Sequence, residues 1–264
     1  MRHWIASLSL FVFALHLEAV QPTALHIALL GDSNTWIGGD DCSKARGWNK
    51  WFKEVLRPAS IRSYARSGAT WTHTPATTID TKENIGTLGD NNVIFNQVKR
   101  LIEAEKNGTQ TIPDLIIIMA GTNDVWFNDK RPHALESLGQ QDCYMADAVD
   151  SVSVVLPCWQ RLVGAVRQNV GLLRTAFPGA RIVLLTPMQT TAAPVDSIAK
   201  ASQLIEAEGG RLGCDVIRLD GDDCISSKHE RQKRTHTSDG THTNVAGARK
   251  IGNYVAGKVL KLIE

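Results

Sequence analysis

The sequence predicts an α/β protein with three layers, α/β/α, built on a parallel sheet of about five strands. Apolar runs of strand length alternate about five times with longer amphipathic segments, and no linker or low-complexity stretch divides the chain. This alternation favours right-handed βαβ units with helices on both faces of the sheet. The chain has 264 residues and is 43% hydrophobic, which is enough for one large domain with a substantial core.

Five apolar runs are the expected strands. Residues 114–121, DLIIIMAG, are nearly all apolar, as a strand covered on both faces must be. In chain order the expected strands are Leu25–Leu30, Ile61–Ala65, Asp114–Gly121, Ala180–Pro187 and Cys214–Asp220.

Helices are expected between these runs. Between the first two strands, apolar residues recur at helical spacing: Trp48, Trp51, Phe52 and Val55. A Pro178-Gly179 pair ends the longest segment, as helix-breaking residues do. The expected helices are 47–57, 92–106, 157–177, 197–212 and 245–262.

Two stretches interrupt the alternation, Thr72–Asp90 and Val125–Val155. Both follow the carboxyl ends of expected strands, which is where open α/β sheets place their binding sites. We interpret both stretches as active-site loops.

The amino-terminal residues resemble a secretory signal peptide. Basic residues precede an apolar block, Trp4–Leu17, that is shorter than the roughly 20 residues of a bilayer-spanning helix. Cleavage is expected after Ala19 or Ala24, so residues 1–24 are assigned to the leader and 25–264 to one folded domain. An uncleaved anchor is the alternative; the prediction is export to a periplasm or out of the cell, without a stable membrane anchor.

Charge and motif content narrow the range of partners. The 29 basic residues nearly balance the 27 acidic ones, and the basic run KHERQKR at 228–234 is short. Such a run is typical of a solvated loop, so no nucleic-acid partner is expected. No C-x-x-C or H-E-x-x-H motif occurs, and neither a metal nor an organic cofactor is expected.

The chain has five cysteines, an odd number. In an exported protein they could form disulfides. The local pairs Cys143 with Cys158 and Cys214 with Cys224 are open, and Cys42 is then left over.

Polar residues follow the first three expected strands and precede the last helix. They are Gly31-Asp32-Ser33, Gly68, Gly121-Thr122-Asn123-Asp124, and Asp239 with His242. A sheet of this kind brings strand ends together. A serine hydroxyl becomes a good nucleophile when an imidazole takes its proton and an acid holds that imidazole in the right tautomer.

Acyl transfer also needs donors for the oxyanion that forms on the carbonyl oxygen. The N–H groups of Ser33 and Gly68 and the side-chain amide of Asn123 are suitable donors. Each residue alone has a structural alternative: Asp239 also suits an N-cap of the last helix, and Gly68 suits an ordinary turn. The four stretches together favour a catalytic site.

These stretches resemble the conserved blocks of the SGNH (GDSL) hydrolase superfamily, in the family's order, from about Leu25 to the end of the chain. The resemblance implies a flavodoxin-like SGNH hydrolase fold. It also implies Ser33 as nucleophile, His242 as base, Asp239 as the acid that orients it, and Ser33, Gly68 and Asn123 as the oxyanion hole.

The sequence departs from the family pattern at two positions. Asn34 stands where the name-giving motif has Leu, at a position interpreted as outside the chemistry. The glycine block lacks the Asn that is often found upstream of it, with Ala65 in that region.

The resemblance implies a serine esterase that cleaves carboxylic esters through an acyl-enzyme. Short acyl esters on carbohydrate, acetyl above all, are the expected substrates, because both site loops are mostly polar and Trp36, Trp71 and Trp126 lie near the motifs. Burial of these tryptophans in the core is the alternative. The other open functions are a lipase or lysophospholipase, an acyltransferase using the same residues, and a carbohydrate-binding module that retains the fold.

Overall fold

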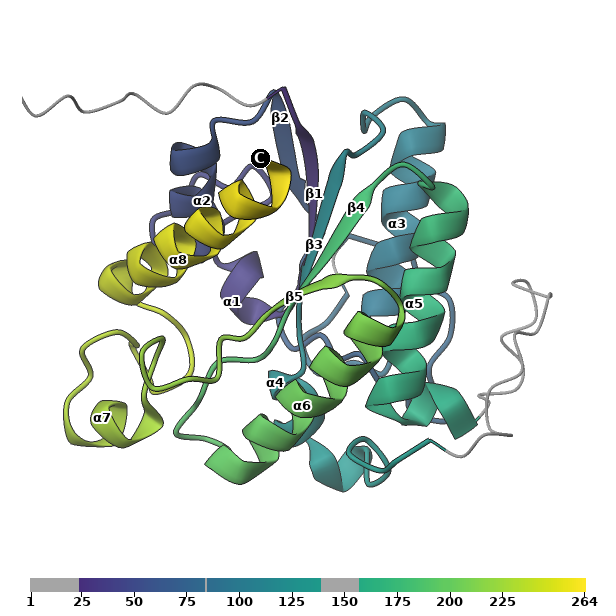
Figure 1. The fold of residues 1–264 in the computed structure, drawn as a ribbon. Coiled ribbons are helices and arrows are strands. Elements are labelled where there is room, and N and C mark those ends of the chain that lie inside the picture. Colours follow the sequence, from purple (N-terminus) through teal and green to yellow (C-terminus); the bar gives the residue numbers. More distant parts are fainter. Residues whose placement is uncertain (1–23, 84, 139–156) are drawn as a thin grey trace, which may run out of the picture.

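The computed structural model describes residues 24–83, 85–138 and 157–264, which form a five-stranded parallel sheet between two layers of helices (Figure 1). The strand order is β2-β1-β3-β4-β5. In this flavodoxin-like order the chain reverses direction across the sheet between β1 and β3, and the carboxyl ends of those two strands border the crevice where such folds bind ligands. The predicted three-layer α/β fold is confirmed.

All five predicted strands are present, with ends that differ by at most three residues. They are β1 (His26–Gly31), β2 (Ser60–Ser63), β3 (Leu115–Met119), β4 (Arg181–Leu185) and β5 (Asp215–Ile217). Gly31 is paired with Met119, so β1 and β3 end side by side. Whatever follows these two strands therefore lies at the same edge of the sheet.

Four of the five predicted helices correspond to single helices, namely α2 (Trp48–Leu56), α3 (Ile94–Lys106), α6 (Val195–Arg211) and α8 (Val245–Ile263). The fifth, predicted as 157–177, is divided into a 3₁₀ turn, Pro157–Gln160, and α5 (Leu162–Ala176). Arg161 between them is extended. The turn folds back onto α5 so closely that the Cys158 carbonyl oxygen would lie 2.1 Å from a Cβ on Gly164.

Three further helices are short: α1 (Ser33–Trp36), α4 (Thr122–Trp126) and α7 (Ser227–Gln232). A 3₁₀ turn, Asn128–Lys130, follows α4. The basic run 228–234 was expected to be a loop, and this is wrong for its first five residues, which lie in α7. The side chain of Ser226 caps that helix at the N–H of His229.

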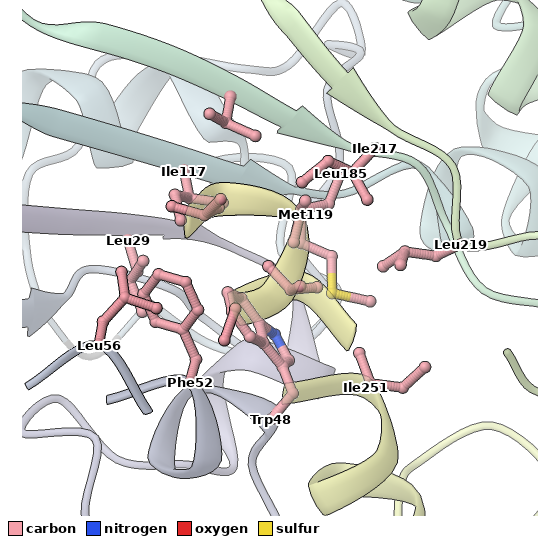
Figure 2. Packing of buried hydrophobic residues seen from close by; sticks show 14 of the residues in the cluster. Leu29, Trp48, Phe52, Leu56, Ile117, Met119, Leu185, Ile217, Leu219 and Ile251 are labelled. Carbon is pink, nitrogen blue, oxygen red and sulfur yellow. The ribbon is translucent and has the colours of Figure 1, made fainter. Parts of the chain in front are cut away.

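The two faces of the sheet form separate apolar clusters because successive side chains of a strand point to opposite faces. Figure 2 shows one cluster, in which Leu29 and Ile117 of the sheet lie among Trp48, Phe52 and Leu56 of α2 and Ile251 of α8. On the other face, Ala28, Leu30, Ile116 and Ile118 pack against α3, α5 and α6. Full burial of each large apolar side chain contributes about 1.5–3 kcal/mol, so the sheet forms a rigid base for the residues at its ends.

The Cys214–Cys224 pair, which the sequence leaves open, forms no disulfide. Both are buried free thiols. Cys214 belongs to the cluster with α3, α5 and α6, and Cys224 to the cluster with α2 and α8, so the sheet separates them. Cys42 is likewise a buried free thiol.

Some sequence predictions fall outside the described residues. These are the leader 1–24 except its last residue, Cys143 and hence its pairing with Cys158, and residues 139–155 of the second site loop. The signal peptide and export therefore stay predictions. No helix in the described part of the chain is both long enough and apolar enough to cross a bilayer.

Candidate active site

Ser33, His242 and Asp239 form a continuous chain of polar contacts beyond the carboxyl end of β1. Ser33 Oγ lies 2.9 Å from His242 Nε2, and His242 Nδ1 lies 2.6 Å from Asp239 Oδ2. With the imidazole proton on Nδ1, the ring donates to Asp239 and accepts from the Ser33 hydroxyl. This arrangement can remove the hydroxyl proton from Ser33.

The end of β1 is held firmly, and it fixes where Ser33 lies. Gln97 of α3 accepts a hydrogen bond from the Gly31 N–H (2.8 Å) and donates one to the Gly31 carbonyl (2.9 Å). A Cβ on Gly31 would lie 2.5 Å from the Met119 carbonyl oxygen. Only glycine therefore allows β1 to run this close to β3 immediately before Asp32 and Ser33.

Asp32 connects β1 to α1. Its N–H donates to the Met119 carbonyl (3.0 Å), and its side chain caps α1 by accepting from the Asn34 N–H (3.0 Å). The side chain is 1% exposed. Burial raises the pKa of Asp32 to about 6, although the Asn34 N–H and the nearby His242 oppose the shift.

Asp239 contacts both the backbone and the ring of His242. One carboxylate oxygen accepts from the N–H groups of Thr241 (2.9 Å) and His242 (2.7 Å). Burial alone would raise the pKa of Asp239, but the hydrogen bonds from His242 and the Thr241 N–H outweigh burial and hold it below its ordinary value. The cap of α8 is Asn244, so Asp239 does not serve as the helix cap that the sequence left open.

The loop before Asp239 is fixed by Glu230 of α7, which is 1% exposed. Its carboxylate accepts from the N–H groups of His236 (2.9 Å) and Thr237 (3.0 Å) and from the Thr237 hydroxyl (2.5 Å). The Thr237 hydroxyl in turn accepts from the Gly240 N–H (3.1 Å). No sequence pattern singles out Glu230, because it lies outside every motif.

Asn123 lies in α4, directly beyond β3. Its side-chain amide donates to the Ala69 carbonyl (2.9 Å) and is 4% exposed. A carboxamide nitrogen carries two protons, so one proton fixes the side chain and the second can serve a ligand.

The other two predicted oxyanion donors are backbone N–H groups. Gly68 has φ +80°, a conformation that glycine adopts without strain, and it directly precedes Ala69, which contacts Asn123. Within the described ranges, the N–H groups of Ser33 and Gly68 donate to no protein acceptor. The three donors that the sequence predicts therefore remain able to bind an anionic oxygen.

Asp124, next to Asn123, holds the loop that carries Ala69. It is completely buried, and it accepts from the N–H groups of Trp71 (3.0 Å) and Thr72 (2.9 Å) and from the Thr72 hydroxyl (2.6 Å). Burial raises the pKa of Asp124, and the Thr72 hydrogen bonds oppose that shift. The last two residues of the G-T-N-D block thus have different roles. Asn123 supplies a side-chain amide, and Asp124 holds the loop at residues 69–72.

Asn34 has a structural role that the sequence did not reveal. Its side-chain nitrogen donates to the Thr241 carbonyl (3.2 Å), and its oxygen accepts from the Thr243 N–H (3.1 Å). These are the residues on either side of His242. A position interpreted as outside the chemistry is therefore in direct contact with the loop between α7 and α8 that carries His242, residues 233–244, here called the histidine loop.

The surroundings of the site differ from the sequence expectation at Trp71 and in the first loop. Trp71 is fully buried, whereas Trp36 and Trp126 are 44% and 40% exposed. The first residues of the loop 72–90 are also buried, and His73 stacks on Trp159 at 4.4 Å between ring centroids. Within residues 24–83, 85–138 and 157–264, no three His, Cys, Asp or Glu side chains gather as metal ligands would.

A flavodoxin-like parallel sheet with a Ser-His-Asp chain beyond β1 and an asparagine amide beyond β3 defines a class of serine hydrolases distinct from those with a G-x-S-x-G turn. The chain matches the model of the GDSL-like lipase/acylhydrolase family over residues 29–250 and belongs to this family. It is a carboxylic ester hydrolase of the GDSL type, as the resemblance implies.

Solved structures share the fold at low sequence identity. A protein from Lactobacillus plantarum superposes with a TM-score of 0.62 at 15% identity, covering 91% of this chain and 99% of that one. A possible lipase from Chitinophaga pinensis gives 0.58 at 15% identity, with 90% and 98% covered. A lipase/acylhydrolase from Enterococcus faecalis gives 0.51 at 15% identity, with 89% and 95% covered. No curated protein matches the chain.

Proposed function

We propose that this protein hydrolyses short-chain esters of carbohydrates, acetyl esters above all, through an acyl-enzyme on Ser33. The observation that supports the catalytic roles is the chain of contacts from Ser33 through His242 to Asp239, with distances of 2.9 and 2.6 Å. Contacts of this length and order are those of a serine nucleophile with its base and orienting acid.

In the proposed first step, Ser33 Oγ attacks the acyl carbon while its proton passes to His242 Nε2. The carbonyl oxygen becomes an oxyanion, which the N–H groups of Ser33 and Gly68 and the amide of Asn123 stabilise. Asp239 stabilises the imidazolium at Nδ1. The carbon–oxygen bond to the alcohol then breaks, and the alcohol leaves with the proton from His242.

In the second step, water replaces the alcohol. His242 Nε2 takes a proton from the water, which attacks the acyl carbon of the serine ester. The second tetrahedral intermediate uses the same oxyanion donors. Its collapse returns the proton to Ser33 Oγ and releases the carboxylic acid.

The preference for a carbohydrate is supported by the exposed tryptophans and by a cavity next to one of them. Trp36 stands three residues after Ser33, on the same face of the single turn of α1. It lines an open cavity of about 570 Å³ together with Asp40, Asp41 and Lys44. A flat aromatic face suits the apolar side of a sugar ring, and the charged groups can hydrogen-bond to its hydroxyls.

The test is a series of chromogenic esters of increasing acyl length, run beside acetate release from acetylated xylan and pectin. The expected result is maximal kcat/KM at two to four carbons and release of acetate from a glycan. A maximum at eight carbons or more, with no glycan deacetylated, contradicts the carbohydrate assignment and favours a lipase. Transfer of the acetyl group to added sugar in preference to water indicates an acyltransferase.

The Trp36→Ala variant tests the cavity separately. We expect a roughly fivefold rise in KM for the acetylated glycan, because stacking on an aromatic face contributes about 1 kcal/mol. The small chromogenic acetate should be unaffected. Trp51→Ala is the control, since Trp51 is a partly buried tryptophan of α2 whose indole N–H donates to the Ala45 carbonyl.

A further inference from the structure

Asn34 joins α1, the turn that carries Ser33, to the histidine loop across more than 200 residues of sequence. Asn34 is 2% exposed. Its amide nitrogen donates to the Thr241 carbonyl (3.2 Å) and its amide oxygen accepts from the Thr243 N–H (3.1 Å). One side chain thus hydrogen-bonds to the backbone on both sides of His242.

These two hydrogen bonds fix the backbone of His242 without touching its ring. The ring itself is held by Asp239 at Nδ1, and the His242 N–H by the same carboxylate. Asp239 belongs to the same loop as His242, so its contacts orient the ring within the loop only. They do not determine how far the loop lies from Ser33.

Asn34 links the loop directly to the turn that carries Ser33, because it follows Ser33 in α1. A displacement of the histidine loop by one ångström would stretch both Asn34 hydrogen bonds at once. Other contacts anchor the loop to different segments. The Thr243 hydroxyl donates to the Arg46 carbonyl (2.7 Å), the Thr191 N–H donates to the Gly240 carbonyl (2.9 Å), and the hydroxyls of Thr190 and Thr241 lie 2.5 Å apart.

We propose that Asn34 is a positioning residue that holds His242 Nε2 within proton-transfer distance of Ser33 Oγ. This inference rests on the proposed roles of Ser33 and His242. The leucine of the family motif has no polar atoms and could form neither hydrogen bond. In this chain the exchange to asparagine therefore adds a connection between nucleophile and base.

The test compares Asn34→Leu and Asn34→Ala with Asn49→Leu on the full chain, using a chromogenic acetate ester. Asn49 is a matched control because it is also fully buried and also donates from its side chain to a backbone carbonyl, that of Thr35 in α1 (3.2 Å). It makes no contact with the histidine loop among the hydrogen bonds of the described residues. Unfolding is followed for all variants by circular dichroism.

We expect both Asn34 variants to lower kcat about 100-fold with KM changed less than about twofold, since misplacement by about one ångström has an effect of that size. Asn49→Leu should lower the unfolding temperature while its kcat stays within a few-fold of wild type. A folded Asn34 variant with wild-type kcat overturns the proposal. An equal loss of kcat in Asn49→Leu also overturns it, because the loss would then follow from reduced stability alone.

A second readout covers the case in which Asn34→Leu does not fold. Asn34→Ala is the smaller change, and the proton on His242 Nδ1 gives a downfield NMR resonance when it is held by Asp239. We expect that resonance to broaden or disappear in Asn34→Ala, and an unchanged resonance together with an unchanged kcat overturns the proposal. Ser33→Ala is assayed in parallel: if it remains active, the proposed function fails, whatever Asn34 does.

Discussion

Two loops border this site, one at residues 69–72 beside Asn123 and one at residues 233–244 that carries His242. Each is held by a buried carboxylate, and the two carboxylates have three contacts in common. Asp124 binds two consecutive backbone N–H groups, at residues 71 and 72, and the hydroxyl of the second residue. Glu230 binds the N–H groups at residues 236 and 237 and again the hydroxyl of the second residue. In both loops the second residue is a threonine, which supplies an N–H and a hydroxyl to the same carboxylate.

The two carboxylates differ in charge balance. Burial dominates at Asp124 and raises its pKa. At Glu230 burial also raises the pKa, but the hydrogen bonds from Thr237, His236 and Thr235 outweigh burial and hold the pKa below its ordinary value. The two carboxylates share three contacts but differ in pH dependence, and Glu230 has one further donor, the Thr235 N–H (3.3 Å).

They also differ in how the sequence presents them. Asp124 follows Asn123 directly, so the Gly121–Asp124 motif that points to the Asn123 amide also contains the Asp124 carboxylate. Glu230 lies nine residues before Asp239, on a helix that no motif contains. A supporting group is thus visible in the sequence only when it is adjacent to the catalytic residue that it supports.

The largest effect should come from removing Ser33 and His242, the proposed nucleophile and base. Ser33→Ala and His242→Ala should each leave a folded protein with kcat reduced on the order of 10⁶-fold, and the double variant should be no worse, because residues acting as one unit are not additive. Steady-state kinetics on a chromogenic acetate measure all three. A double variant that loses the sum of the two free energies would contradict a shared mechanism.

Asn123→Ala tests the oxyanion side alone. Loss of one oxyanion donor usually lowers kcat about 100- to 1000-fold, and KM should change little because the donor acts mainly on the developing charge. The variant also loses the hydrogen bond to Ala69 (2.9 Å), so circular dichroism must show an intact fold. A loss confined to KM would make Asn123 a substrate-binding residue.

Asp124→Asn and Glu230→Gln test the difference in charge balance between the two buried carboxylates. Each amide turns an N–H₂ group toward a backbone N–H, so each should lower the free energy of unfolding by about 3 kcal/mol at neutral pH. The pH dependence should then differ. A lowered pKa gives stability that is lost as the pH falls through the carboxyl range, so the Glu230→Gln deficit should shrink in acid.

At Asp124 the sign is opposite. A raised pKa contributes stability at low pH and loses it as the pH rises, so the Asp124→Asn deficit should persist in acid. Urea unfolding at pH 4 and pH 7 measures both variants. If the two deficits change in parallel, the proposed difference in charge balance is wrong.

The fold was predictable because its signals are local and long. β3 is buried at every residue, Leu115–Met119, and reads as a continuous apolar run; α2, α3, α6 and α8 repeat their apolar residues over two turns or more. α1, α4 and α7 have four to six residues each, too few for a helical period to show. The split before α5 depends on packing against Gly164, which no local pattern records.

Within the site, the sequence supplied the residues of the motifs but not the contacts between distant segments. Ser33 and Asn123 lie just beyond β1 and β3, where parallel-sheet topology brings strand ends together, and Asp239 and His242 lie in the loop before α8. Asn34 is separated from its partners by more than 200 residues, and its motif position suggested an inert exchange. The burial of Trp71 was equally hidden, because a tryptophan beside a motif suits both a core and a binding surface.

The smallest effect concerns Asp32, a third buried carboxylate at the same edge, whose side chain accepts the Asn34 N–H and faces Thr122, Asp124 and His242. Burial raises its pKa to about 6 from an ordinary value of 3.8. Its contribution to stability is therefore present at low pH and is lost as the pH rises from about 4 to above 6.

Asp32→Asn keeps an oxygen for the Asn34 N–H and removes the buried charge. With about 1.4 kcal/mol per pKa unit, the variant should be more stable than wild type by roughly 3 kcal/mol at pH 7 and nearly equal to it at pH 4. Because a negative charge near His242 favours the imidazolium of the transition state, kcat should fall a few-fold while stability rises. Urea unfolding of both proteins across this pH range measures the difference, and a gap that stays constant from pH 4 to pH 7 would show that Asp32 does not titrate there.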